Sequence, residues 1–324
     1  MRGFAALLVD WQRRHGRHGL PWQGTREPYR IWLSEVMLQQ TQVATVAPYY
    51  ERFLACFPRI EALAAASLDD VLRLWSGLGY YARGRNLHAA ARAVVSQGGF
   101  PRTAAGLEAL PGVGRSTAAA IAVFAFGKRA AILDGNVKRV LARRFGVQGE
   151  AAQWSLAERL LPRRGVRAYT QALMDLGATV CTRTQPACAR CPVARGCVAR
   201  REGRIDELPA PRVRKALPFR SADWYVYLDR GAVLLERRPP AGLWGGLWTF
   251  PESAVLGIAA RRKLAPVEHG FTHFRLRAQP LLCAPRAGRR VRGPRLWLTL
   301  ADAVEAAVPT PVRGVLRGLL KSPR

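Results

Sequence analysis

The chain has 324 residues, 49% of them hydrophobic, which is enough for two domains with cores of their own. Its net charge of +29 indicates a polyanionic partner, most simply nucleic acid, although nearly all of its 51 basic residues are arginines, a skew that coding bias also produces. The apolar, uncharged run at residues 116–127 is too short to span a bilayer, and no uncharged run exceeds 15 residues, which excludes a membrane-spanning protein. The opening MRGFAALLVDWQRR meets charge too early for a secretory signal, so we expect a soluble, cytoplasmic protein.

Helical patterns dominate residues 1 to about 205. The opening segment predicts an amphipathic helix, and apolar residues recur at helical spacing over residues 87–95 and 121–125. Gly127 and Gly146 stand where helices are expected to end, because glycine accepts the left-handed backbone of a C-cap. We therefore predict an all-α domain over this part of the chain.

Glu35 lies in the apolar run IWLSEVML, residues 31–38, of a predicted helix. Only 22 residues are acidic, so a carboxyl inside such a run is informative. Burial would raise its pKa and keep it protonated, as a general acid requires. The alternative is a solvent-facing glutamate without a chemical role.

The segment LPGVGRST, residues 110–117, predicts a turn between two helices. We expect Gly112 and Gly114 to take positive φ and to let the backbone lie against a ligand. Ser116 and Thr117 then open an apolar helix whose first N–H groups point toward an anion. In a basic protein this arrangement predicts a clamp for DNA phosphates. An ordinary αα-hairpin would explain the same glycines.

Asp134 precedes Gly135-Asn136-Val137 at the predicted start of a further helix, which it should cap. The N–H donors and the helix dipole at that position are expected to lower its pKa. A protonated Glu35 beside an ionised Asp134 would pair a general acid with an anionic stabiliser. Helix capping alone is the alternative role for Asp134.

Four cysteines follow the pattern C-x6-C-x2-C-x5-C. Thiolates gathered in so short a loop repel one another unless a cation or cluster binds them. Single ligands spaced around one compact loop suit a [4Fe–4S] cluster with one thiolate per iron, held by Cys181, Cys188, Cys191 and Cys197. Structural zinc is the alternative. Positive charge for phosphates is expected around this loop from Arg183, Arg190, Arg195, Arg200 and Arg201.

The composition shifts at residues 206–218, DELPAPRVRKALP, which predicts an extended linker. Strand-like runs follow at residues 224–228, 232–236, 271–276 and 296–300, and short helical patterns at 302–307 and 312–320. We therefore predict a smaller α+β domain over residues 219–324.

Long motifs occur in one order along the chain: LPW (20–22), SEVMLQQTQV (34–43), GLGYYARGRNL (77–87), LPGVGRST (110–117), ILDGNVKRV (132–140), MDLGATVC (174–181), GLWGGLW (242–248) and FTHF (271–274). In these motifs the chain resembles the helix–hairpin–helix DNA glycosylases of the endonuclease III superfamily, and within it the MutY family. The resemblance implies two helical lobes with a [4Fe–4S] loop over residues 1–205, followed by a Nudix-like domain. It also implies base excision repair of double-stranded DNA, by removal of adenine mispaired with 8-oxoguanine or guanine from an extrahelical position.

The resemblance implies roles for individual residues. Glu35 matches the acid that protonates the adenine ring, Asp134 the carboxylate that stabilises the oxocarbenium-like sugar, and Asn136 a supporting residue. The positions lining the adenine pocket are matched by Trp22, Leu38 and Gln171. Positions set against the duplex or the lesion are matched by Gln40, Thr41, Leu78, Tyr80, Thr272 and His273.

Ser116 stands where the bifunctional relatives carry a lysine that attacks the sugar. A hydroxyl cannot form a Schiff base, so the resemblance implies a monofunctional enzyme that uses water. The nearest alternative is an endonuclease III-like glycosylase and lyase for oxidised pyrimidines. A non-catalytic, redox-responsive DNA-binding protein is another, although it leaves Glu35 and Asp134 unexplained.

The carboxy-terminal domain resembles the Nudix-like module that reads 8-oxoguanine in this family. Its segment 251–268 offers only Glu252 and Glu268, so we expect binding without Mg²⁺-dependent hydrolysis, which argues against a nucleotide pyrophosphatase. Thr272 replaces the usual serine of the family's loop and keeps its hydroxyl. A monomer is expected.

Overall fold

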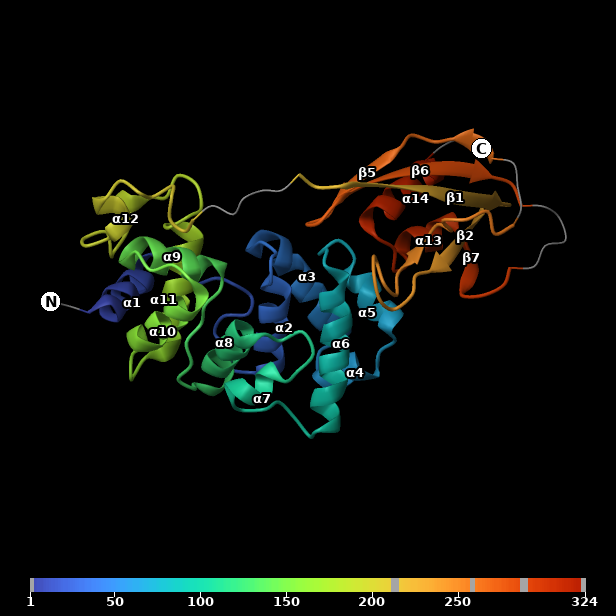
Figure 1. The fold of residues 1–324 in the computed structure, drawn as a ribbon. Coiled ribbons are helices and arrows are strands. Elements are labelled where there is room, and N and C mark those ends of the chain that lie inside the picture. The colour runs from blue at the N-terminus through green and yellow to red at the C-terminus, as the bar shows by residue number, and fades with distance from the viewer. Residues whose placement is uncertain (1–2, 211–215, 257–259, 286–290, 322–324) are drawn as a thin grey trace. The chain divides into compact units, whose positions relative to one another are not determined.

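The structure, a computed structural model, describes residues 3–210, 216–256, 260–285 and 291–321. It divides into two compact units (Figure 1). The first unit comprises Met1–Ala64 and Ala89–Val213, and the second comprises Ala65–His88 and Arg214–Arg324. Residues 65–88 therefore group with the carboxy-terminal part of the chain, which the sequence patterns did not indicate.

The first unit is helical over its described residues, as the sequence predicted. Its helices are α1 (Phe4–His15), α2 (Pro28–Leu38), α3 (Val43–Cys56), α7 (Ala104–Glu108), α8 (Arg115–Phe126), α9 (Gly135–Phe145), α10 (Glu150–Leu160), α11 (Val166–Thr179) and α12 (Val198–Arg201), with a 3₁₀ turn at Cys188–Arg190. Helices α4 (Ile60–Ala65) and α6 (Tyr81–Ser96) cross from one unit into the other. No helix in the described part of the chain is both long and apolar enough to cross a membrane.

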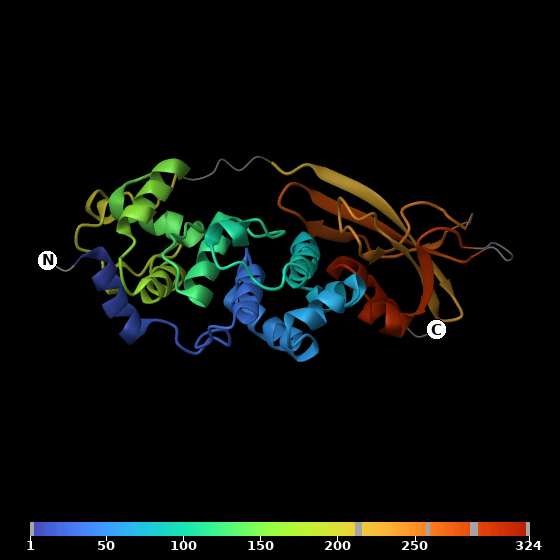
Figure 2. The same cartoon turned by 90° about the horizontal axis from the view of Figure 1, so that it is seen from below.

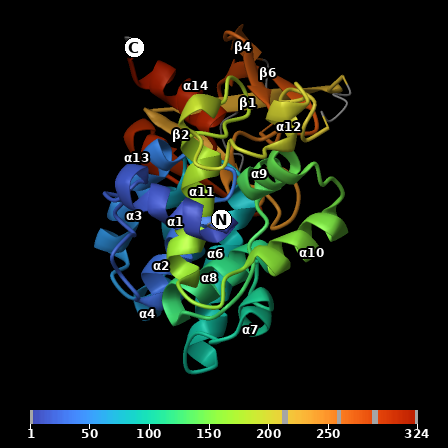
Figure 3. The same cartoon turned by 90° about the vertical axis from the view of Figure 1, so that its left-hand side faces the viewer.

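Two packing centres organise the first unit. Helix α2 packs against α3 and α8, while α9 packs against α10, α11 and α12, and α1 lies along α11 (Figures 1 and 3). Helix α8 is apolar on nearly all sides, RSTAAAIAVFAF, because it is buried between its neighbours. Its Val123 lies in one buried cluster with Leu8, Val137, Leu141 and Leu173.

The ends of three helices place the residues of interest. Helix α2 begins at Pro28 and is capped by the Glu27 carboxylate, which accepts hydrogen bonds from two backbone N–H groups. Helix α9 begins after Asp134, as predicted. Gly127 and Gly146 end α8 and α9 in the left-handed conformation, with φ of 64° and 73°, which confirms their predicted role as C-caps.

The carboxy-terminal part of the second unit carries a mixed sheet followed by two helices. Its strands are β1 (Phe219–Asp229), β2 (Ala232–Arg237), β3 (Trp248–Thr249), β4 (Ala260–Lys263), β5 (Val267–Gly270), β6 (Arg275–Cys283) and β7 (Arg295–Thr299), and its last helices are α13 (Leu300–Glu305) and α14 (Thr310–Lys321). Strands β1 and β6 run parallel over nine paired residues, from the pair Phe219 and Arg275 to the pair Tyr227 and Cys283 (Figure 2). Strand β2 pairs antiparallel with β1, β3 and β7, and β6 pairs antiparallel with β4 and β5. The predicted α+β class is confirmed.

The predicted strands agree with the structure except at their ends. Residues 271–274 form a turn and β6 begins only at Arg275, so the first four residues of the predicted strand 271–276 are wrong. Aromatic residues at 271 and 274 gave that segment a strand-like pattern, but their rings stack on each other across the turn, 4.5 Å apart. Leu300 opens α13 rather than ending β7, because the Thr299 side chain caps that helix. The described parts of the predicted linker 206–218, residues 206–210 and 216–218, hold neither helix nor strand.

Residues 65–88 join the second unit through specific polar contacts. Helix α5 (Leu68–Trp75) carries Asp69, whose carboxylate accepts a 2.7 Å ion pair from Arg237 of β2. The Ser76 hydroxyl donates to the Val308 carbonyl at 2.8 Å, and Arg85 donates to the Gly245 carbonyl at 2.8 Å. All three contacts join residues more than 150 positions apart in the sequence, so no local sequence pattern could predict them.

Candidate active site and cysteine cavity

Glu35 lies on α2 at the wall of a cavity. Its helix neighbours Trp32, Leu33 and Met37 are fully buried, whereas Glu35 is half-buried and lines the cavity. The pKa of Glu35 is raised from 4.5 to about 8, chiefly by burial and in smaller part by the nearby carboxyl of Asp134. Glu35 is therefore mostly protonated at neutral pH, as the sequence analysis expected for a general acid.

The cavity has a volume of about 500 Å³ and a mixed polar and apolar wall, which suits a flat heterocycle. It is enclosed by the loop 17–26, by α2 and by the first half of α11, with Phe124 of α8. The three residues matched to the adenine pocket, Trp22, Leu38 and Gln171, all line it together with Glu35. Residues 22, 35, 38 and 171 are thus brought together from distant parts of the chain.

Asp134 caps α9, and its carboxylate accepts a 2.7 Å hydrogen bond from the Val137 N–H. The expected direction of its pKa is wrong: burial raises the pKa of Asp134 more strongly than the N–H groups of Val137 and Asn136 and the charge of Arg139 lower it. The two carboxyls nevertheless lie within electrostatic range of each other, because Asp134 contributes to the raised pKa of Glu35. The structure therefore brings the acid and the capping carboxyl together, with both pKa values raised.

Asn136 supports this end of α9 rather than lining the cavity. Its side-chain carbonyl accepts a 2.7 Å bond from Arg139, which also donates to the Gly177 carbonyl at 2.7 Å. Helix α11 passes so close that a Cβ added to Gly177 would lie 2.6 Å from the Asn136 Cβ. Only glycine fits at residue 177, and the start of α9 is clamped against α11 there.

The turn before α8 differs in part from expectation. Gly112 has φ of 76° as predicted, but Gly114 has φ of −89° and caps α8 in an extended conformation, so its predicted positive φ is wrong. Helix α8 begins at Arg115, and the Ser116 hydroxyl accepts a 2.9 Å bond from the Leu133 N–H. Ser116 therefore ties the start of α8 to the residue immediately before Asp134.

Gln40 and Tyr80 share an unusual backbone. Each has positive φ, 56° and 47°, although neither is glycine, and both side chains are exposed. Thr41 beside Gln40 is half-buried. In the second unit the Trp75 indole donates to the Gly79 carbonyl at 3.1 Å, which fixes the loop that presents Tyr80. Leu78 of the same loop is only 5% exposed, so its side chain is not presented as that of Tyr80 is.

The four cysteines of the C-x6-C-x2-C-x5-C pattern line one small apolar cavity with Val180, Pro186 and Ala199. The thiols are close enough to influence one another, since those at 181, 197 and 188 all raise the pKa of Cys191, although burial is the larger cause. The described residues hold no group of three His, Cys, Asp or Glu side chains gathered around a single point as one metal ion requires. Four thiols around one apolar cavity offer one ligand to each iron of a [4Fe–4S] cluster, so the residues present fit that group.

Two arginines of α9 hold the cysteine loop, and sequence reasoning missed both. Arg143 is buried, and it donates to the carbonyls of Thr182 and Arg183 at 2.6 and 3.0 Å and to that of Leu208 at 2.8 Å. Arg139 donates to the Cys181 carbonyl at 2.7 Å. Their spacing of four residues places them on one face of α9 and was the available signal. Such a pair of arginines more often faces solvent, so the spacing alone did not identify their role.

The turn between β5 and β6 presents Thr272 and His273, which are both exposed. Beneath them Phe271 and Phe274 stack, and the Phe271 N–H donates to the Phe274 carbonyl at 2.9 Å. The acids of the segment 251–268 do not converge: Glu252 pairs with Arg238 at 3.0 Å and Glu268 with Arg277 at 4.0 Å.

Two family models match successive parts of the chain. Residues 33–162 match the HhH-GPD superfamily base excision DNA repair proteins, and residues 223–318 match the NUDIX domain. Among solved structures, a thermostable thymine-DNA glycosylase is similar with a TM-score of 0.58 and 30% identity, over 61% of this chain and 95% of that one. An endonuclease III in a non-covalent DNA complex, at 21% identity and a TM-score of 0.54 over the same shares of the two chains, shares the fold.

Full-length relatives carry the assignment further. The chain is 38% identical to an adenine DNA glycosylase of Buchnera aphidicola subsp. Baizongia pistaciae, over 98% of this chain and 97% of that protein. It is 32% identical to the same enzyme of Buchnera aphidicola subsp. Acyrthosiphon pisum, over 98% of both chains. It is 35% identical to that of Homo sapiens, over 97% of this chain and 73% of the human protein. With Glu35 and Asp134 brought together beside a base-sized cavity, and with relatives matched along almost its whole length, the chain belongs to the adenine DNA glycosylase family.

Proposed function

We propose that the protein hydrolyses the N-glycosidic bond of adenine paired with 8-oxoguanine or guanine in double-stranded DNA. The observation that carries the proposal is the Glu35 carboxyl, held protonated by burial in the wall of a cavity of base size. Adenine extruded from the duplex would enter that cavity beside Trp22, Leu38 and Gln171.

Catalysis divides between the two carboxyls. Glu35 donates its proton to a ring nitrogen of adenine, which makes the base a better leaving group. Positive charge then develops on the sugar, and the Asp134 carboxylate stabilises it while the N–H of Val137 holds that carboxylate in place. Asn136 positions the start of α9, and water completes the hydrolysis because Ser116 offers no amine.

We also propose that Cys181, Cys188, Cys191 and Cys197 hold a [4Fe–4S] cluster. The cluster would cross-link the loop between α11 and α12, whose carbonyls Arg139 and Arg143 already bind. No step of the hydrolysis needs it.

DNA contacts are assigned to both units. The phosphate clamp is proposed at Gly112, Gly114 and Ser116, and wedging or lesion contacts at Gln40, Thr41, Leu78, Tyr80, Thr272 and His273. The positive backbone φ of Gln40 and Tyr80 supports a role for both in DNA contact, because strained backbone conformations are frequent at functional sites. We further propose a glycosylase domain over 1–205, a linker over 206–218, a recognition domain over 219–324, and a monomeric enzyme.

The test uses the iron-loaded protein and a duplex with a single adenine opposite 8-oxoguanine, followed by alkali and a denaturing gel. Wild type should give a strand break only after alkali, and Glu35→Gln should lose roughly 10²- to 10⁴-fold in rate with duplex binding retained. Glu61→Gln, the same change at an exposed carboxyl of α4, is the matched control and should react as wild type does. Absence of adenine release by wild type would overturn the proposal, normal release by Glu35→Gln would overturn the role of Glu35, and breaks before alkali would overturn the monofunctional reaction.

A further inference from the structure

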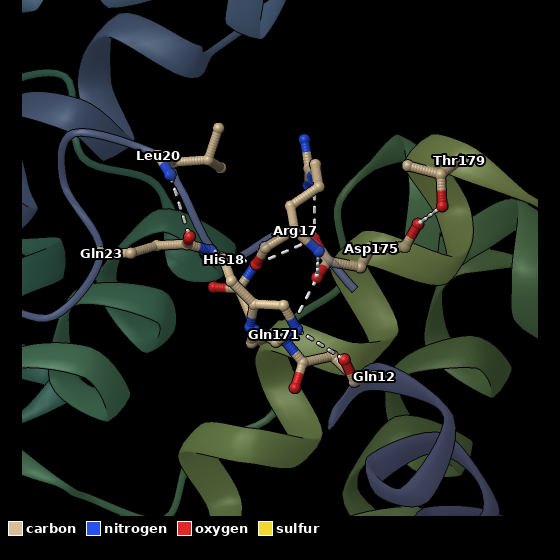
Figure 4. Close-up of polar contacts among 8 residues, drawn as sticks. All are labelled: Gln12, Arg17, His18, Leu20, Gln23, Gln171, Asp175 and Thr179. Carbon is tan, nitrogen blue, oxygen red and sulfur yellow. Dashed lines mark hydrogen bonds and ion pairs between the residues drawn. The ribbon is translucent and has the colours of Figure 1, made fainter. Parts of the chain in front are cut away.

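Asp175 is a fully buried carboxylate behind the wall of the base cavity, on α11. Four donors surround it (Figure 4). Its Oδ1 accepts from the Arg17 guanidinium at 2.7 Å and from the Gln171 amide at 3.0 Å. Its Oδ2 accepts from the Arg17 backbone N–H at 3.0 Å and from the Gln12 amide at 3.4 Å. Because all four of these groups are donors, both oxygens of Asp175 act as acceptors toward them.

This arrangement fixes which way the Gln171 amide points. Because Asp175 accepts, the Gln171 Nε2 must face it, and the Gln171 Oε1 is left as the free end of the amide. Gln171 lines the cavity, and within the described residues no group donates to its Oε1. Because the buried Asp175 carboxylate binds the amide nitrogen of Gln171, the amide oxygen of Gln171 is the atom left to accept a hydrogen bond from a ligand in the cavity.

Two other polar side chains of this wall, Gln23 and His18, already bind protein groups. The Gln23 amide donates to the Arg17 carbonyl at 3.0 Å and accepts from the Leu20 N–H at 3.1 Å, so both its ends bind backbone. The His18 Nε2 lies 3.0 Å from the Gln12 carbonyl, to which it donates. These three bonds hold the loop that carries Arg17, and both ends of the Gln23 amide are occupied by backbone groups.

We propose that Asp175 is a positioning residue for base selection: by orienting the Gln171 amide it presents an acceptor that favours a purine with a 6-amino group over one with a 6-carbonyl group. The inference rests on the proposed function. Adenine carries a donor at this position, on the same edge as the ring nitrogen N7, whereas hypoxanthine carries an acceptor there. An acceptor that cannot rotate rejects the carbonyl, because turning the amide would break its bond to Asp175.

Asp175→Asn should invert this selection rather than merely weaken it. The backbone N–H of Arg17 cannot move away, so it holds the new side-chain oxygen at the Oδ2 position. The new amide nitrogen then takes the Oδ1 position, where it can no longer accept from the Arg17 guanidinium. That partly exposed side chain turns toward solvent, and the new nitrogen donates to the Gln171 Oε1. Gln171 turns its own Nε2 toward the cavity, where a donor now favours a 6-carbonyl group.

The experiment measures single-turnover release of adenine, hypoxanthine and unsubstituted purine, each opposite 8-oxoguanine in the same duplex, by the iron-loaded protein. For Asp175→Asn the ratio of adenine to hypoxanthine rates should fall roughly 10- to 100-fold from its wild-type value, the size expected when one buried polar group loses its match. The matched control is Thr179→Ala, which removes a 2.8 Å bond to the Asp175 backbone carbonyl and leaves the carboxylate alone, so its ratio should equal that of wild type. Equal slowing of all three bases by Asp175→Asn would overturn the inference, because a structural defect has no reason to prefer one base.

A second variant covers the case in which Asp175→Asn does not fold at the assay temperature. Gln171→Leu removes the acceptor and leaves the pair of Asp175 and Arg17 intact. Its ratio of adenine to unsubstituted purine rates should fall about tenfold, since the 6-amino group is no longer read, and an unchanged ratio would overturn the inference. If wild type releases none of the three bases, the proposed function falls and this inference with it. Release with unchanged ratios in the variants overturns the inference alone.

Discussion

The buried Glu35 makes a prediction about stability that is separate from catalysis. Folding raises its pKa from 4.5 to about 8, so the folded protein holds this proton more tightly than the unfolded chain does. The stabilisation is therefore complete below pH 4.5 and is lost as the pH rises to 8, above which it stays constant. The difference between the two pKa values corresponds to about 5 kcal/mol in all, and to about 3 kcal/mol lost by pH 7.

Glu35→Gln removes this ionisation and should therefore stabilise the protein at high pH. Its melting temperature should match that of wild type near pH 4.5 and exceed it by roughly 10 °C at pH 8. The assay is thermal unfolding of wild type, Glu35→Gln and Glu61→Gln at intervals between pH 4.5 and 9, the last variant correcting for the loss of one exposed carboxyl. A difference between wild type and Glu35→Gln that does not grow with pH would refute the argument that burial sets this pKa.

Three further outcomes follow from packing and backbone geometry. Gly177→Ala places a methyl 2.6 Å from the Asn136 Cβ, so it should lower the free energy of unfolding by about 1–3 kcal/mol and slow adenine release. Urea unfolding and single-turnover kinetics measure the two effects. The control is Gly314→Ala, where an added Cβ meets open space, and its release rate should equal that of wild type. Arg143→Gln removes the donors to the carbonyls of Thr182 and Leu208, so it should lower the iron content of the purified protein and lower the free energy of unfolding by about 2–5 kcal/mol. The control is Arg159→Gln, at an exposed residue of α10, which should change neither quantity. Gln40→Gly relieves a left-handed backbone and should leave stability within about 1 kcal/mol of wild type while weakening duplex binding, and equal binding would contradict the contact assigned to Gln40.

The sequence predicted most accurately what depends on local pattern. Glu35 in an apolar helix, the capping of α9 by Asp134 and the left-handed glycines at 127 and 146 each follow from neighbours within a few residues. The cysteine spacing likewise identified a loop whose four thiols share one cavity. In each case the property depends on residues close in the sequence, so it could be predicted without knowledge of the tertiary fold.

Contacts across long sequence separations could not be predicted in this way. Asp175 lies in a helical segment whose neighbouring residues give no sign of a partner. Its ion pair with Arg17, 158 residues away in the sequence, could therefore not be predicted. Residues 65–88 read as part of a continuous helical domain, yet they join the second unit through Asp69 and Ser76. Long-range pairing of single polar side chains leaves no periodic signal.

The sign of the Asp134 pKa shows how tertiary structure overrides a local rule, and it bears on the proposed chemistry. Capping bonds favour the anion, but the surrounding protein withdraws water from it, and the second effect is larger. An anion held in so unfavourable a setting gains more from a positive charge that forms beside it than a well-solvated anion would. The oxocarbenium-like sugar supplies that charge as the glycosidic bond breaks and not before. In the proposed mechanism the interaction with Asp134 is therefore stronger in the transition state than with the bound substrate, and only an interaction of that kind accelerates a reaction.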